Sequence, residues 1–162
     1  MEFEMAHEFE ADVSEVAEAI LDLDFQASLA DVGRLAGREV LSQDPDGEAV
    51  IRRTRCILDI DISGPAKRFI GDGDPAWVEV ARWDPEAMVW EWHIEPEIAA
   101  DLLEARGTTE LKPSKNGTIR HVTGKVRVKV PLYGGKVEGW IVDGLESAYD
   151  EEAQRLADWL AR

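Results

Sequence analysis

Cysteine is almost absent from this chain: Cys56 is the only one among 162 residues. A lone cysteine cannot form an internal disulfide, which is typical of proteins in a reducing compartment. Long apolar runs are missing too, since no segment approaches the ~20 apolar residues that a membrane-spanning helix needs. The first residues lack a basic region followed by an apolar one, so we expect no signal peptide. We therefore expect a cytoplasmic protein without a transmembrane segment.

Positive charge is also scarce, because 18 Lys and Arg residues face 34 Asp and Glu residues, for a formal net charge of −16. This balance disfavours binding to nucleic acid or to an anionic membrane surface. A strongly solvated surface is the favoured interpretation, and docking of a basic partner is the alternative. Arg52, Arg53 and Arg55 form a small basic cluster. Arginine can hold a carboxylate in a bidentate manner, but we expect these three to pair with acidic residues at the surface.

Motifs for catalysis or metal binding are missing as well. The three histidines, His7, His93 and His121, are far apart, and none begins a recognised ligand spacing. Glu91, His93 and Glu95 share one strand face, but a solvated outer face explains them better than a metal site. The sequence therefore predicts no catalytic residue, no metal and no cofactor.

The strongest pattern lies at the C-terminal end. Between Val137 and Leu160 apolar residues recur at spacings of three and four, with charged residues on the other side. A helix over residues 135–160 would be roughly 40 Å long at 1.5 Å per residue, so it needs a wide partner such as a curved sheet. Gly144 interrupts the apolar stripe, either for close backbone approach or to leave room for a guest.

Two segments alternate with period two, as half-buried strands do. In residues 2–10 apolar residues alternate with glutamates, and in 118–130 valines alternate with basic residues. Matching apolar faces and opposite charges make these segments candidates for neighbours, so we pair the first strand with the last. His7, on the apolar side of the first strand, is predicted to be a satisfied core residue.

The middle of the chain predicts more strands and few helices. Asp12 begins a capping sequence for one short helix, and a second short helix is expected at 24–32. Asn116-Gly117 predicts a hairpin turn. A loop is expected at 63–75, with Phe69 and Ile70 as a candidate lid. The remaining strands are predicted at 38–42, 49–62, 76–83, 88–95 and 101–112. Without linkers or repeats, we expect a single domain over residues 1–162.

This order of elements resembles the helix-grip fold of the START-like (SRPBCC) superfamily. The strand-to-helix junction at residues 124–138, GKVRVKVPLYGGKVE, is similar to a bacterial branch of uncharacterised function. The first strand and the Gly64-Pro65-Ala66 loop before Trp77 are similar to that branch too. The resemblance implies an α+β fold in which a bent seven-stranded antiparallel sheet wraps a long C-terminal helix, with two short helices after the first strand. It also implies a hydrophobic cavity between sheet and helix.

The predicted cavity wall combines strand and helix residues that share an inward-facing side. Simple filling of the core is the alternative for the large aromatic residues among them. The predicted lining residues are Trp90, Trp92, Leu103, Val126, Trp140, Leu145 and Tyr149.

Three hypotheses for function follow. The first is a binding or carrier protein for a small hydrophobic ligand. The second is an enzyme of the cyclase or hydratase kind, with His7 or Tyr149 as the proton-transfer group in the same cavity. The third is a protein-interaction module that uses its acidic surface and has no open cavity.

Overall fold

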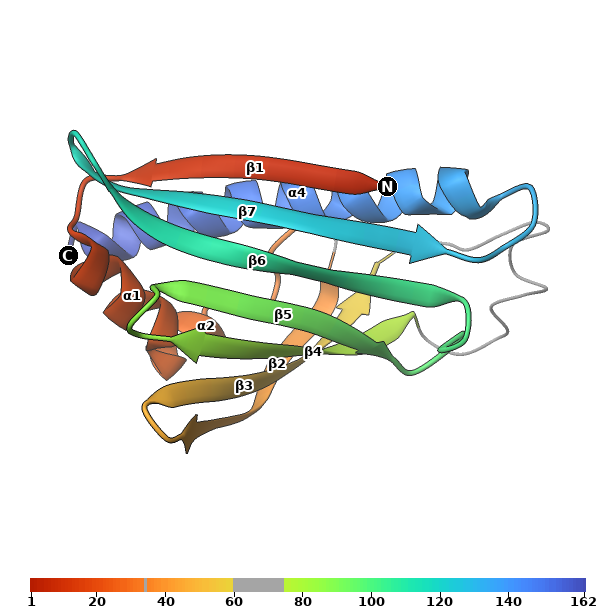
Figure 1. Ribbon diagram of the computed structural model, residues 1–162, viewed down its shortest axis with the longest axis horizontal. Coiled ribbons are helices and arrows are strands. Elements are labelled where there is room, and N and C mark those ends of the chain that lie inside the picture. The colour runs from red at the N-terminus through yellow and green to blue at the C-terminus, as the bar shows by residue number, and fades with distance from the viewer. Residues whose placement is uncertain (34, 60–74) are drawn as a thin grey trace.

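The computed structural model describes residues 1–33, 35–59 and 75–162. One seven-stranded antiparallel sheet, in the order β1-β7-β6-β5-β4-β3-β2, curves around the long helix α4 (Figure 1). The predicted α+β helix-grip arrangement is therefore confirmed. The predicted loop at 63–75 lies outside the described residues except for Pro75, and so does the candidate lid. The elements are β1 (Glu2–Phe9), α1 (Val13–Leu21), α2 (Leu23–Ala27), β2 (Leu35–Asp46), β3 (Ala49–Leu58), β4 (Ala76–Asp84), β5 (Val89–Pro96), β6 (Leu103–Ser114), β7 (Gly117–Val128) and α4 (Gly134–Leu160).

The first strand pairs with the last, as the charge pattern predicts. The β1–β7 register runs from Glu2 opposite Lys125 to Phe9 opposite Thr118. On the outer face, His121 Nε2 lies 2.6 Å from a carboxylate oxygen of Glu4, which is an exposed contact between the two strands. The inner face of both strands is buried against α4, so the alternation of apolar and charged residues sets the register.

Two glycines shape the centre of the concave face. Gly107 of β6 and Gly124 of β7 are opposite each other, and they are flanked by Trp92 of β5 and Phe3 of β1. The rings of Phe3 and Trp92 stack with centroids 6.1 Å apart. A Cβ on Gly107 would lie 2.1 Å from the Thr123 carbonyl oxygen and 2.5 Å from Trp92 Cζ2. The missing side chains therefore give the two rings room to lie across the sheet.

The short helices close one end of the sheet, where α4 also ends (Figure 1). Asp12 and Glu15 form the predicted capping box at the start of α1. Helix α2 is shorter than predicted, because it ends at Ala27 and the Ser28 hydroxyl donates to the Phe25 carbonyl at 2.6 Å. Such a side-chain bond competes with helix continuation. The fully buried Phe25 contacts Trp159 of α4, with ring centroids 5.4 Å apart.

Strand β2 is longer than the predicted strand at 38–42, because it begins at Leu35 and continues to Asp46. Its pairing with β3 continues to Asp46 opposite Ala49, so the reversal takes only Gly47 and Glu48. Gly47 has φ +64°, a left-handed conformation that glycine adopts without strain. At the other end of the chain, β7 stops at Val128 rather than at residue 130.

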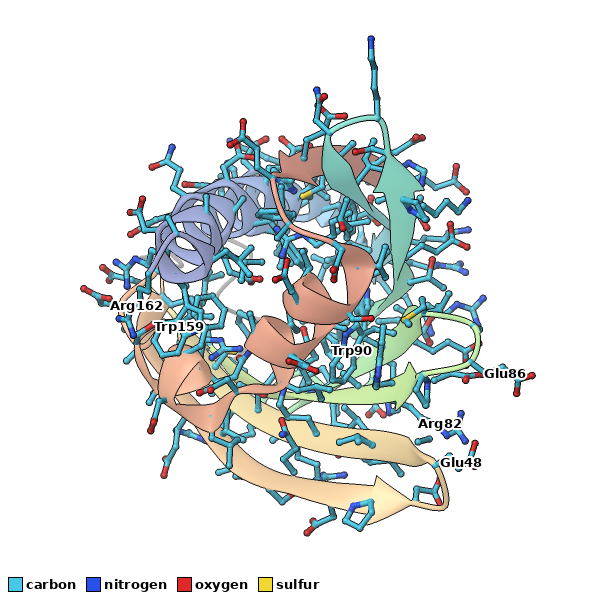
Figure 2. All side chains as sticks on the ribbon, turned by 90° about the vertical axis from the view of Figure 1, so that its left-hand side faces the viewer. Glu48, Arg82, Glu86, Trp90, Trp159 and Arg162 are labelled. Carbon is cyan, nitrogen blue, oxygen red and sulfur yellow. The ribbon has the colours of Figure 1, made fainter. Side chains whose placement is uncertain are left out.

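Helix α4 is the element that the sheet encloses. Seen from one end, the strands curve around it, with Trp90 inside the curve and Glu48, Arg82 and Glu86 pointing outward (Figure 2). The polar side of the 27-residue helix is heavily charged. No helix in the described part of the chain is long and apolar enough to cross a membrane.

Candidate ligand-binding pocket

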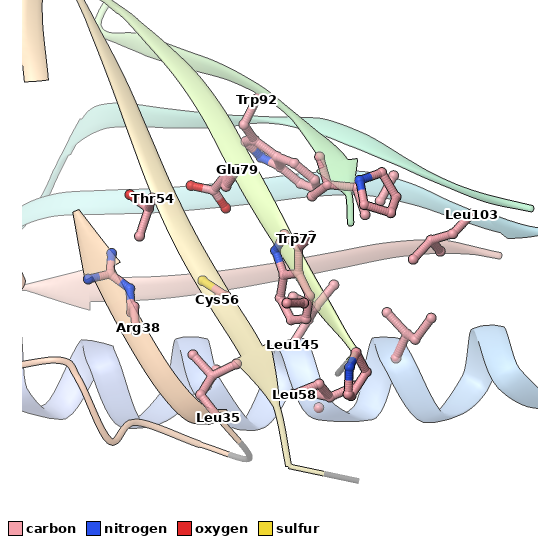
Figure 3. Close-up of a pocket in the computed structure, with 18 of the residues that line it drawn as sticks. Leu35, Arg38, Thr54, Cys56, Leu58, Trp77, Glu79, Trp92, Leu103 and Leu145 are labelled. Carbon is pink, nitrogen blue, oxygen red and sulfur yellow. The ribbon is translucent and has the colours of Figure 1, made fainter. Parts of the chain in front are cut away.

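A pocket with a volume of about 180 Å³ lies between the concave face of the sheet and α4 (Figure 3). Most of its wall is apolar, with residues from α1, β2 to β7 and α4. For comparison, an engineered cavity of roughly 150 Å³ accommodates benzene. The pocket is thus large enough for one ring system or a short acyl chain.

Five of the seven predicted lining residues are on the wall of this pocket: Trp90, Trp92, Leu103, Leu145 and Tyr149. Val126 is fully buried but is not part of the wall. Trp140 is 42% exposed, with Lys136 Nζ 5.3 Å from the centre of its ring. Val126 and Trp140 were predicted to line the pocket, but the structure places both outside its wall. On α4 the residues that face the pocket are Val137, Ile141, Gly144, Leu145, Ala148, Tyr149 and Glu152.

One side of the pocket lies where two strands separate. The pairing of β5 with β6 ends at His93 opposite Arg106. Ile94 and Leu103, which lie beyond that point, both line the pocket. Ala99, in the connection between these strands, lines it too and has φ +52°, an unusual conformation for a residue with a side chain. Between β5 and β6, this part of the wall is therefore closed by side-chain packing and not by backbone hydrogen bonds between the two strands.

The sequence interpretation missed a group of charged residues in this wall. Arg52 has the same strand parity as Cys56, so its guanidinium points inward and its side chain is only 6% exposed. The expected surface pairing is therefore wrong for Arg52, although Arg53 and Arg55 do pair with Glu95 and Glu97 on the outer face. Strand parity alone was the signal that could have found it. The charged pocket residues are Arg38, Arg52, Glu79, Arg120 and Glu152.

Arg120 and Glu152 neutralise each other. The Arg120 side chain is 1% exposed, and its Nη1 lies 2.6 Å from Glu152 Oε1. Its Nη2 lies 3.3 Å from the Tyr149 carbonyl oxygen and 3.2 Å from His7 Nδ1. The other ring nitrogen of His7 lies 2.8 Å from an Asp150 oxygen. His7 is thus a satisfied residue behind the pocket wall, as predicted.

Arg38 and Arg52 are held by neutral groups. Arg52 Nη1 donates to the Ile20 carbonyl at 2.9 Å, and its guanidinium lies 4.6 Å from the centre of the Trp90 ring. Arg38 donates to the carbonyl and the side-chain oxygen of Gln26 at 3.0 and 2.5 Å. Burial, followed by the charge of Arg38, lowers the pKa of Arg52 to about 10. Among the described residues, neither arginine forms an ion pair with a carboxylate.

Glu79 faces the same space from β4 (Figure 3). Its carboxyl makes no hydrogen bond or ion pair with any residue that the structure describes. Burial raises the pKa of Glu79, and the charges of Arg52 and Arg38 offset only part of this effect. Glu79 is half-buried, and a carboxyl withdrawn from water without a hydrogen-bond partner costs stability, which makes Glu79 a candidate functional residue.

We expect the substitution Glu79→Gln to increase the free energy of unfolding at neutral pH. A raised pKa means that the folded state binds more protons than the unfolded state, so stability falls as pH rises above the ordinary value of 4.5. Chemical denaturation of both proteins across pH would measure this. The gain should vanish below that ordinary value, where both states are protonated. A wild-type protein that is less stable than Glu79→Gln by the same amount at every pH would contradict the expectation.

Two other titratable pocket residues stay neutral near pH 7. Burial raises the pKa of the Cys56 thiol to about 12. Burial also raises the pKa of the Tyr149 hydroxyl far above its ordinary value. Neither group is therefore activated as a nucleophile or as a proton donor. Within the described ranges, no cluster of three or more His, Cys, Asp or Glu residues could hold a metal ion.

A family model described as "Protein of unknown function (DUF2505)" matches residues 4–160. The chain belongs to this family. Comparison with curated proteins finds no match by sequence. The DUF2505 chain thus has a family, but the family description assigns it no activity.

Solved structures support the fold of this DUF2505 protein. It is similar to TTHA0849 from Thermus thermophilus, with a TM-score of 0.67 and 19% identity over 96% of this chain and 97% of that one. It is also similar to the ZhuI aromatase/cyclase from Streptomyces sp. R1128, with a TM-score of 0.66 and 12% identity over 100% of this chain and 94% of that one. A START superfamily protein from Mycobacterium smegmatis has a TM-score of 0.64 and 14% identity over 98% of each chain. The START-like resemblance is confirmed for the fold.

Proposed function

We propose that this protein binds or carries a small, largely apolar molecule in the pocket between the sheet and α4. The observation that carries the proposal is the pocket itself: about 180 Å³ of space, walled mainly by aliphatic side chains and by Trp77, Trp90 and Trp92. Apolar area removed from water contributes about 25 cal/mol per Å² to binding. The START-like fold, which other proteins use around a cavity, is consistent with this proposal.

The substitution Gly144→Leu tests the proposal by filling the pocket. Gly144 lines the pocket from α4, and a Cβ there would meet only Leu58 Cδ1, at 3.8 Å. A leucine at this position should project into the space while removing a helix-interior glycine that costs about 1 kcal/mol. We expect the wild-type protein to bind 1-octanol in isothermal titration calorimetry, and Gly144→Leu to bind it at least about tenfold more weakly, with no loss of thermal stability.

The matched control is Gly139→Leu on the same helix. Gly139 does not line the pocket, and a Cβ there would meet only Met1 Cε, at 3.7 Å. This variant should gain the same helix propensity and bind 1-octanol like the wild type. Native mass spectrometry of the freshly purified protein provides a second readout. A wild-type protein that neither copurifies with an apolar molecule nor binds 1-octanol would overturn the proposal.

One observation favours a second candidate, an enzyme of the cyclase or hydratase kind. Glu79 is a pocket carboxyl with a raised pKa, which is typical of a general acid. His7 lies outside the pocket, and the raised pKa of Tyr149 makes it a weak acid. An aromatase/cyclase is among the similar folds. Conversion of a copurified molecule by the wild type but not by Glu79→Gln would favour the enzyme.

A further inference from the structure

We propose that the polar end of the pocket, between Arg38, Arg52 and Glu79, binds the carboxylate of a small apolar acid. This inference rests on the proposed function, because it assigns the chemistry of the guest's head group. The three residues come from adjacent strands: Arg38 lies opposite Cys56 on β2 and β3, and Arg52 of β3 is next to the β4 strand that carries Glu79. Their side chains enter one part of the pocket, as Figure 3 shows for Arg38 and Glu79.

The charge balance of the pocket wall favours a ligand that carries one negative charge. Among the described lining residues there are three arginines and two glutamates. Arg120 and Glu152 form their own ion pair. Arg38 and Arg52 then supply two positive charges, and an ionised Glu79 supplies one negative charge. One ligand carboxylate would make this end neutral, so a monoanion fits better than a neutral or a cationic group.

An excess of positive charge, as at this end of the pocket, is unusual for the molecule. The whole chain carries a formal charge of −16, so an arginine exposed on the surface has many acidic neighbours to pair with. Arg52 instead is buried, and its Nε has no hydrogen-bond partner among the described residues. Removing a guanidinium from water costs several kcal/mol unless an anion compensates it. The partial negative charge of the Ile20 carbonyl, near the end of α1, meets only part of this need.

The neighbouring groups suit a carboxylic acid in particular. Arginine presents a planar pair of donors that matches the two oxygens of a carboxylate. The apolar wall beyond, with Trp92, Leu103 and Leu145, then receives the rest of the molecule. The pocket volume allows a short acyl chain or one ring system, as argued above.

Three probes with the same chain and different head groups test the inference. Isothermal titration calorimetry of the full chain near neutral pH compares octanoate, 1-octanol and octylammonium. We expect octanoate to bind at least about tenfold more tightly than 1-octanol, and octylammonium to bind more weakly than either. If 1-octanol binds and octanoate binds no more tightly, this inference is wrong while the proposed function stands. The same holds if octylammonium binds best. If none of the three binds, this inference is wrong, and the proposed function is wrong as well unless an apolar molecule copurifies with the protein.

The variant Arg52→Met removes the central cation and keeps an apolar stem. It should abolish the preference, so that octanoate binds no more tightly than 1-octanol. The matched control is Arg53→Met on the same strand, because Arg53 points to the outer face and pairs with Glu95; it should keep the full preference. Arg38→Met provides a second inward variant if Arg52→Met fails to fold. An unchanged preference for octanoate in a folded inward variant would exclude the arginine end as the carboxylate site.

Discussion

The substitution Gly107→Ala is expected to lower the free energy of unfolding by about 3 kcal/mol, the upper end of the usual cost of overpacking a core. The added methyl group would lie 2.1 Å from the Thr123 carbonyl oxygen on the next strand. That oxygen belongs to the backbone, so relief requires the two strands to separate. The methyl would also lie 2.5 Å from Trp92 Cζ2, and would push that ring off the concave face. Urea denaturation followed by tryptophan fluorescence measures the change.

Two further glycine substitutions show whether steric contact is the cause. At Gly124 the nearest atoms belong to the rings of Phe3 and Trp92, at 2.5 to 2.9 Å, and rings can move more easily than backbone, so Gly124→Ala should cost less. At Gly37, also a strand glycine, an added Cβ meets only the Ile57 side chain, whose nearest atom, Cδ1, lies at 3.5 Å. Gly37→Ala should therefore lie within about 0.5 kcal/mol of the wild type. Equal losses at Gly37 and Gly107 would show that the close approach of β6 and β7 is not the reason.

The second large effect is expected for Glu152→Leu. Removing one partner of a buried ion pair typically costs about 3–5 kcal/mol, because the remaining charge stays buried without compensation. Arg120 is 1% exposed, and Glu152 is its only carboxylate partner among the described residues. The remaining contacts of Arg120 are with His7 and the Tyr149 carbonyl, and with the ring faces of Phe9 and Tyr149. We therefore expect a loss of about 3 kcal/mol in the same denaturation measurement.

A double-mutant cycle separates the charge effect from the loss of packing. The double variant Arg120→Leu/Glu152→Leu should be more stable than Glu152→Leu alone, since no uncompensated charge remains. Glu104→Leu is the control, because Glu104 pairs with Lys129 at 2.7 Å on the exposed face. Loss of that surface pair should cost less than about 1 kcal/mol. Similar costs for Glu104→Leu and Glu152→Leu would mean that burial does not govern the strength of the Arg120 pair.

The fold could be predicted to a large extent because its signals are local and periodic. The alternation in residues 2–10 and 118–130, together with the opposite charges of the two segments, sufficed to pair β1 with β7. The three-four spacing predicted α4 to within one residue at its start. Strand parity likewise predicted that Trp90 and Trp92 point to the inner face. Each of these patterns reflects a backbone repeat, so it can be recognised without tertiary information.

The polar part of the pocket could not be predicted in the same way. Arg52 and Glu79 have inward parity, but a charged residue is normally assigned to the solvent side. Their burial depends on groups far away in the chain, such as the Ile20 carbonyl for Arg52. Trp140 was misplaced for a related reason. The apolar stripe of α4 is broad, and only the rotation of the helix against the sheet decides which part of it faces the pocket.

By itself, the amino-acid sequence determined the pairing of the first strand with the last, the long amphipathic helix and the acidic character of the chain, because hydrophobic period and charge act through neighbouring residues. Only the tertiary structure decided that Arg38, Arg52 and Glu79 share one enclosed space and that Arg120 meets Glu152. Such contacts arise when strands and helices distant in sequence pack together, and the low-dielectric interior then sets the strength of each charge interaction.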